Sequence, residues 1–189
     1  LLLEDIQDPG NLGSILRSAA GAGIRHICLS KSSVHGWSPR VLRAGMGAHF
    51  MLDIHEQCDL VEIARSFHGR VIVTAPETDK SIFETDLTGN IALVFGNEGA
   101  GVSVALAAVA HDTVTIPMPG NIESLNVGAA VAVCLFERVR QLVNPPHQFR
   151  FLQDSGCQFL DGLAGCVLKG NVFAPHHGLG FTYFEFTIA

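Results

Sequence analysis

Residues 116–130, IPMPGNIESLNVGAA, carry the most information about the architecture of this chain. The segment leaves a short apolar strand, crosses a loop bounded by proline and glycine, and enters an apolar run over residues 127–136. The polar side chains Glu123, Ser124 and Asn126 therefore lie where a loop becomes a buried helix. Backbone N–H groups at such a helix start, together with hydroxyl and amide side chains, favour a crevice that holds a ligand.

Strands and helices alternate along the chain before this segment. Short apolar stretches predict strands at residues 1–6, 24–30, 49–54, 70–75, 91–96 and 113–118. Helical periodicity predicts helices at residues 11–23, 39–44, 58–69, 103–110 and 126–141, with Asn11 as the N-cap of the first. This alternation predicts an α/β fold, a mostly parallel sheet with helices on both faces.

The composition is that of a folded chain. Its 189 residues are 48% hydrophobic, which is enough for one well-cored domain and an appendage. The longest apolar stretches, residues 91–95 and 127–136, are too short to span a bilayer, so we expect no membrane association. The chain begins without Met and has no signal-peptide pattern, and we interpret it as a sequence whose start has been cut away.

The cysteines indicate a reducing compartment. There are five of them, widely spaced and set mostly among apolar neighbours, and no CxxC occurs. This pattern favours buried free thiols in a cytoplasmic protein. A zinc site built from Cys157, Cys166, His176 and His177 is the alternative, but its spacing resembles no common zinc finger, and we expect no metal.

The character of the chain changes at Asn144. The sequence NPPH ends the last helix, and residues 144–189 contain seven of the twelve Phe and the single Tyr, with five charged residues. We expect residues 1–143 to form the main domain. Residues 144–189 are expected to be a tail of unknown origin, either a β-rich appendage or a segment foreign to the fold, and we assign it no catalytic role.

The charge of the chain is unevenly distributed. The net charge of −6 speaks against a general nucleic-acid binder, yet no acidic residue occurs between Asp8 and Asp53. That stretch contains five basic residues, Arg17, Arg25, Lys31, Arg40 and Arg43. A basic segment of this kind can face phosphates even in an acidic protein, and a solvated surface without a partner is the alternative.

Two further loops follow predicted strands and have unusual chemistry. DPGNLGSILRSA, residues 8–19, opens the first helix. The side chains of Asn11 and Arg17 are close enough in this segment to contact one ligand. LVFGNEGAG, residues 93–101, has glycines that let the backbone approach a ligand closely, with Glu98 among them. A capping residue, a solvated arginine and a tight turn are the structural alternatives. The glycine spacing fits neither a dinucleotide fingerprint nor a P-loop.

Taken in order, these three loops resemble the signature motifs of the SpoU/TrmH group of SPOUT RNA methyltransferases. The resemblance covers about residues 1–142 and excludes the tail after Asn144. It implies transfer of a methyl group from S-adenosylmethionine to a ribose 2′-hydroxyl of rRNA or tRNA. It also implies an α/β fold with a C-terminal trefoil knot, and a homodimer.

The resemblance implies roles for particular residues. The residues expected to bind the cofactor are Thr74, Ala75, Gly96, Asn97, Ile116, Met118, Leu125 and Asn126. The residues expected to act in catalysis are Arg17, Asn11, Glu98, Ser124 and Asn126. A guanidinium is effectively always protonated, so Arg17 fits a phosphate contact or stabilisation of a developing 2′-alkoxide better than the role of a general base.

Other functions for this sequence remain open at this point. A catalytically idle relative would bind RNA or cofactor without turnover, although the motif residues are intact. A dehydrogenase-type nucleotide-binding enzyme is disfavoured by the glycine spacing, and a structural dimer module would not need the polar loops. RNA bases are usually read by stacking on aromatics, and Trp37 is the candidate for that contact, with ordinary packing as its alternative.

Overall fold

A computed structural model describes residues 1–76, 78–97, 99–120 and 124–143. Within these ranges six strands form one sheet in the order β3-β2-β1-β5-β4-β6, and every strand pairing is parallel. The strands are β1 Leu2–Leu3, β2 His26–Ser30, β3 Asp53–Cys58, β4 Arg70–Thr74, β5 Ile91–Phe95 and β6 Asp112–Val114. The predicted parallel sheet is confirmed.

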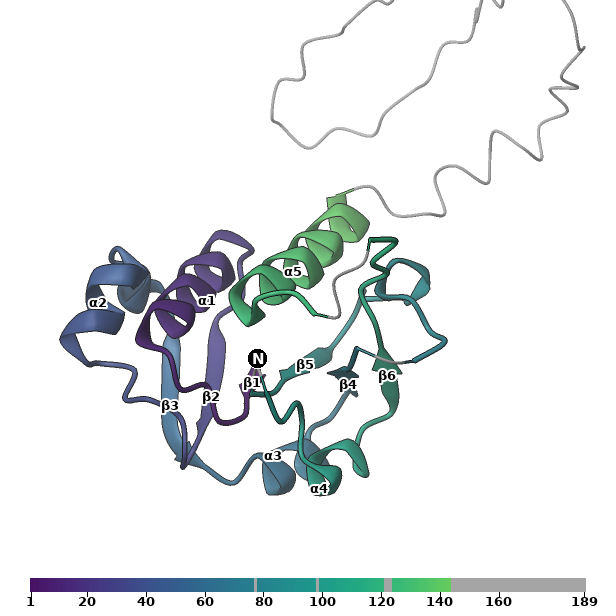
Figure 1. The fold of residues 1–189 in the computed structure, drawn as a ribbon, viewed down its shortest axis with the longest axis horizontal. Helices are drawn as coiled ribbons and strands as arrows, with labels where there is room; N and C mark the ends of the chain where they lie inside the picture. Colours follow the sequence, from purple (N-terminus) through teal and green to yellow (C-terminus); the bar gives the residue numbers. More distant parts are fainter. Residues whose placement is uncertain (77, 98, 121–123, 144–189) are drawn as a thin grey trace, which may run out of the picture. The chain divides into compact units, whose positions relative to one another are not determined.

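Helices cover both faces of this sheet, as the sequence predicts. In the described part of the chain they are α1 Pro9–Gly21, α2 Pro39–Gly45, α3 Leu60–Ser66, α4 Val104–Ala107 and α5 Val127–Val143, with the 3-10 turns η1 Ala48–Met51 and η2 Ile82–Glu84. Figure 1 shows α1, α2 and α5 on one face and α3 and α4 on the other, with α1 between α2 and α5.

Each face of the sheet has its own core. Successive strand residues point to opposite faces, so Leu93 and Phe95 of β5 pack under α1 and α5, while Ala92 and Val94 pack with α3 and α4. The same alternation divides the residues of β1 and β4. Burial on both faces explains why these strands read as continuous apolar runs.

The strand predicted at residues 49–54 is wrong in its position. Residues 48–51 form the 3-10 turn η1 instead, and β3 runs from Asp53 to Cys58. His49 is only 3% exposed, and its Nε2 lies 2.8 Å from the carbonyl oxygen of Gly36, so the imidazole ring attaches η1 to the fold although η1 does not join the sheet. The true strand, DIHEQC, is polar because it is the edge strand of the sheet.

The start of the first helix also differs from the prediction. Asp8 is the N-cap, because its Oδ1 accepts a hydrogen bond of 2.7 Å from the backbone N–H of Asn11, and Pro9 occupies the first helical position. Asn11 therefore lies inside the first turn, and the prediction that it caps α1 is wrong. The Asn11 side chain makes a contact outside its own helix instead, since its Oδ1 accepts a hydrogen bond from Asn126.

The cysteines agree only in part with the predicted buried thiols. Cys28, Cys58 and Cys134 are free, but only Cys134 is fully buried among them. Burial raises the pKa of the Cys134 thiol to about 12, which leaves it protonated and unreactive at neutral pH. Cys157, Cys166 and the rest of the tail lie outside the described residues, as does the alternative zinc site.

Among the described helices, none has the length and the apolar character needed to cross a membrane.

A close approach of two backbones fixes the packing of α1 against α2. A Cβ atom placed on Gly13 would lie 2.4 Å from Cβ of Ala44 and 2.9 Å from the backbone nitrogen of Gly45. Only a residue without a side chain fits there, so Gly13 sets the spacing between the two helices.

We therefore predict that Gly13→Ala destabilises the protein by about 1–3 kcal/mol, because α2 must move away from α1. Gly21→Ala in the same helix is the matched control, since its Cβ would meet only Phe136 at 3.9 Å, an ordinary contact. Urea unfolding of the two variants measures the difference. Equal stability of both variants would contradict the close-packing explanation.

Candidate functional site

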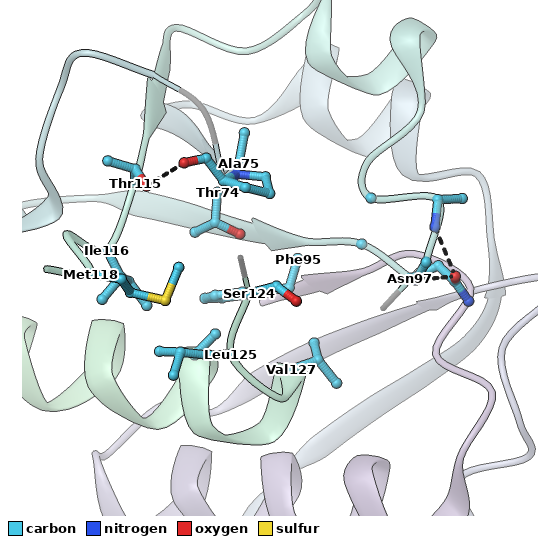
Figure 2. A pocket seen from close by; sticks show the side chains of 16 residues that line it. Thr74, Ala75, Phe95, Asn97, Thr115, Ile116, Met118, Ser124, Leu125 and Val127 are labelled. Atoms are coloured by element: carbon cyan, nitrogen blue, oxygen red, sulfur yellow. Dashed lines mark hydrogen bonds between the residues drawn. The ribbon is translucent and has the colours of Figure 1, made fainter. Parts of the chain in front are cut away.

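A cavity of about 280 Å³ opens beyond the carboxyl ends of strands β4, β5 and β6. In parallel sheets this edge is where ligands bind, because loops from several strands meet there. Figure 2 shows the cavity with Ile116 and Met118 at one end and Asn97 at the other. Its described lining residues are Thr74, Ala75, Pro76, Phe95, Gly96, Asn97, Gly99, Ala100, Gly101, Thr115, Ile116, Met118, Ser124, Leu125, Val127 and Ala130.

The described lining of the cavity is uncharged and largely apolar. Ile116, Met118 and Leu125 supply apolar side chains from the connection between β6 and α5, and Phe95 is the buried end of β5. The polar groups are hydroxyls, the Asn97 amide and loop backbone. Such a lining suits a flat or apolar ligand group that is oriented by a few hydrogen bonds. Among the described residues, no group of His, Cys, Asp and Glu side chains is arranged to hold a metal ion.

The loop after β5 is folded back on itself without room for a side chain. A Cβ atom on Gly96 would lie 2.1 Å from the carbonyl oxygen of Gly101, and Gly101 has φ of +70°. The backbones of Asn97 and Gly101 exchange hydrogen bonds of 3.1 and 2.9 Å. The glycines predicted from the sequence to allow close backbone approach therefore meet each other, and this contact shapes one wall of the cavity.

The Asn97 side chain holds this loop in place. Its Oδ1 accepts hydrogen bonds from the backbone N–H groups of Gly99 at 2.8 Å and Ala100 at 3.1 Å. Its Nδ2 donates a 3.0 Å hydrogen bond to the carbonyl oxygen of Asp5, in the loop after β1. The predicted cofactor residue Asn97 thus joins the loops that follow the two central strands of the sheet.

Asn126 joins the starts of α1 and α5. Its Oδ1 accepts hydrogen bonds from the backbone N–H groups of Gly128 at 2.9 Å and Ala129 at 3.3 Å, so it caps α5. Its Nδ2 donates a 2.9 Å hydrogen bond to Oδ1 of Asn11. The carboxamides of two predicted catalytic residues are therefore in direct contact, although they lie 115 positions apart in the sequence.

The remaining predicted site residues are placed as follows. Seven of the eight predicted cofactor residues line the cavity, and Asn126 does not, although its chain neighbours Leu125 and Val127 do. Ser124, predicted for catalysis, also lines it. Arg17 is exposed on α1, about 9 Å along the helix axis from Asn11, and is not part of the lining. Glu98 lies outside the described residues.

Sequence reasoning missed several lining residues. Phe95, Thr115, Val127 and Ala130 line the cavity but carry no obvious chemistry in the sequence. Phe95 and Thr115 lie at or just after strand ends, which was an available signal. Val127 and Ala130 face the cavity from the first turn of α5, and only the packing of α5 beside the sheet places them there.

The fold and the cavity define an α/β protein with a cavity at the carboxyl edge of a parallel sheet, the place where proteins of this architecture bind small ligands. The SpoU rRNA Methylase family matches residues 1–136 of the chain. This chain belongs to that family.

Curated relatives share the same region. A 23S rRNA (guanosine-2′-O-)-methyltransferase RlmB of Pectobacterium atrosepticum is 35% identical over 144 residues, which cover 75% of this chain and 59% of the relative. An uncharacterized tRNA/rRNA methyltransferase of Synechocystis is 38% identical over 144 residues, 75% of this chain and 53% of the relative. The chain thus spans somewhat more than half the length of these relatives.

Solved structures show the same fold. An AdoMet-bound rRNA methyltransferase from Sinorhizobium meliloti is similar with a TM-score of 0.70 and 33% identity, over 75% of this chain and 55% of that chain. The SpoU methyltransferase AviRb from Streptomyces viridochromogenes, in complex with AdoMet, is similar with a TM-score of 0.69 and 32% identity, over 75% and 59%.

The double role of Asn126 can be separated by two substitutions. We predict that Asn126→Ala destabilises the protein by about 1–2 kcal/mol, because α5 loses its cap and its hydrogen bond to Asn11. Asn126→Asp keeps a capping oxygen at the helix start and should retain most of the stability, although it loses the donor to Asn11. Urea unfolding measures both. An equal loss of unfolding free energy in the two variants would show that the cap of α5 does not contribute to the stability.

Proposed function

We propose that this chain is the catalytic domain of an RNA ribose 2′-O-methyltransferase that uses S-adenosylmethionine. The observation that carries the proposal is the cavity at the sheet edge, whose described lining is uncharged, with the hydrogen-bonded pair Asn11–Asn126 beside it. The RlmB relative and the AdoMet-bound neighbours support the activity and the cofactor. The substrate is an rRNA or a tRNA.

The cavity fits the proposed cofactor in size and chemistry. Its volume of about 280 Å³ is near the lower end of about 300–1,000 Å³ for small-molecule sites, which suits a compactly bent ligand. We assign the adenine to the apolar side chains of Ile116, Met118 and Leu125. Thr74, Ala75 and the Gly96–Asn97 backbone would hold the polar parts by hydrogen bonds.

The acceptor ribose is proposed to bind where α1 and α5 begin. Asn126 lies between two cavity-lining residues and contacts Asn11, so this pair is assigned to orient the ribose rather than the cofactor. Ser124, which lines the same cavity, adds a hydroxyl. Glu98, in the loop after β5, is proposed to complete this polar set.

Bound S-adenosylmethionine supplies an electrophilic methyl carbon attached to a sulfonium sulfur. Asn11, Ser124 and Asn126 would hold the ribose hydroxyl in line with that carbon, and their positioning is the main contribution of the chain. Arg17 is proposed to bind the adjacent phosphate and to stabilise the negative charge that develops on the 2′-oxygen. The described lining is largely apolar, which strengthens the polar interactions made inside the cavity.

The family resemblance also implies a homodimer and a knotted chain. We propose a homodimer, in which exposed apolar side chains of α5 such as Phe136 and Leu142 become covered. We also propose the C-terminal trefoil knot. The passage from β6 at the sheet edge to α5, packed beside α1 on one face, is compatible with it.

Two further assignments follow from the sequence pattern. Residues 1–143 are proposed as the methyltransferase domain, which agrees with the extent of the family match, and residues 144–189 as a tail that takes no part in catalysis. The cytoplasm is proposed as the location, because the described cysteines are free thiols.

Calorimetry tests the cofactor assignment. We expect the protein to bind S-adenosylmethionine or its demethylated product, and Gly96→Ala to weaken the affinity by more than about tenfold, because the new Cβ forces the loop away from Gly101. Gly21→Ala, outside the cavity lining, is the matched control, since its Cβ would meet only Phe136 at 3.9 Å. A folded wild type that binds neither ligand would refute the cofactor assignment.

Methyl transfer tests the role of Arg17. We expect Arg17→Ala to lower the incorporation of labelled methyl groups into separated rRNA and tRNA fractions by roughly 10²–10³-fold, the usual cost of losing a transition-state donor. Arg65→Ala, which removes an exposed arginine from α3 on the opposite face, is the control. Equal rates for Arg17→Ala and the wild type would remove Arg17 from the mechanism.

A further inference from the structure

The segment formed by α2 and η1 presents apolar side chains to solvent. Phe50 is 92% exposed, and Met46 and Met51 are each 71% exposed, with Trp37 and Leu42 also exposed nearby in the chain. Met46 and Gly47 both have left-handed backbone conformations, which end α2 and lead directly into η1. We call the surface formed by Trp37, Arg40, Leu42, Arg43, Met46, Phe50 and Met51 the α2–η1 surface.

This surface is positively charged and has no acidic residue of its own. Arg40 and Arg43 are exposed on α2, and neither forms an ion pair within the described part of the chain. Asp53 is the first acid after Asp8, and it pairs with Arg25 at 3.1 Å. The cations of the α2–η1 surface are therefore free to meet phosphates.

The α2–η1 surface is continuous with the proposed catalytic residues through α1. Phe50 and Met51 line a shallow hollow at the end of α1, together with Ala20, Gly23 and the ion pair of Arg25 with Asp53. Arg17 is exposed one turn before Ala20 on the same helix. A path therefore runs from Asn11 at the start of α1 past Arg17 to Phe50, on the order of 20 Å at the rise of an α-helix.

We propose that the α2–η1 surface docks single-stranded RNA next to the methylated nucleotide, with a base stacked on Phe50 and phosphates on Arg40 and Arg43. The proposal rests on the proposed function and extends it to substrate recognition. Exposed aromatic rings between cations are the elements by which proteins hold unpaired RNA. A second copy fits less well, because a twofold contact of this surface with itself would bring like charges together.

The single tryptophan of the 189-residue chain provides the measurement. Trp37 lies 5.1 Å from the ring of His49, the residue before Phe50, so its fluorescence reports on this surface. We expect a short oligouridylate to quench it. Phe50→Ala should weaken the RNA affinity about five- to 150-fold, the range for loss of one base stack.

Phe83→Ala is the matched control for this experiment. Phe83 is 48% exposed, but it lies in η2 beside Glu84 and away from the α2–η1 surface, so its truncation should leave RNA affinity unchanged. Arg40→Gln with Arg43→Gln should lower the slope of log affinity against log salt by roughly 0.7 for each phosphate that the protein no longer neutralises. Because these side chains are exposed, thermal unfolding should remain that of the wild type.

The outcomes separate this proposal from the proposed function. Wild-type RNA affinity in Phe50→Ala, or no quenching by RNA in the wild type, would overturn the RNA-docking role even if cofactor binding and methyl transfer are intact. A shift of Phe50→Ala to a smaller species in sedimentation velocity, with RNA affinity unchanged, would assign the surface to a second copy. RNA binding that depends on Phe50, in a protein that binds no S-adenosylmethionine, would support this surface and refute the proposed reaction.

Discussion

The hydrogen bond between Asn126 and Asn11 is the constraint on which the arrangement of the site depends. One carboxamide caps α5 through its oxygen and contacts α1 through its nitrogen, so the two helices begin side by side at the same edge of the sheet. Leu125 and Val127, on either side of Asn126 in the chain, are thereby directed into the cavity. Gly128 permits this geometry, because a Cβ there would approach Asn126 Oδ1 to 3.2 Å.

A second group of contacts joins the C-terminal part of α5 to the segment between η2 and β5. Near its C-terminus, Gln141 is buried and accepts a hydrogen bond of 2.8 Å from the backbone N–H of Leu87, while it donates to Thr85 and Glu137. Arg140 donates to Glu137, and this interaction lowers the pKa of the Glu137 carboxyl. A buried polar network of this kind, fully paired, fixes one position of the helix. The helix is therefore held at both ends.

The chain separates its apolar and charged functions in space. The described cavity lining is uncharged, whereas Arg17, Arg40 and Arg43 of the acid-free stretch lie on α1 and α2, outside the cavity. Such a division is favourable for a protein that holds a small ligand and a polyanion, because an apolar pocket excludes water while surface cations attract phosphates at a distance. The net charge of −6 conceals this local excess of positive charge.

The sequence alone determined the α/β class, the parallel sheet and half of the described cavity lining, because strand ends in such sheets converge and the glycine-rich or polar loops at those ends can be recognised. It misplaced β3 and the cap of α1. An edge strand such as DIHEQC carries little apolar signal, and Asp8 and Asn11 both have capping side chains. Only the tertiary structure decided that Asn126 contacts Asn11. It also decided that Gly96 packs against Gly101 and that the side chain of Phe50 is exposed to solvent. The Asn126–Asn11 contact depends on how segments distant in sequence pack together, and the other two depend on the exact backbone path of a loop or turn. Local patterns of hydrophobicity and charge specify neither.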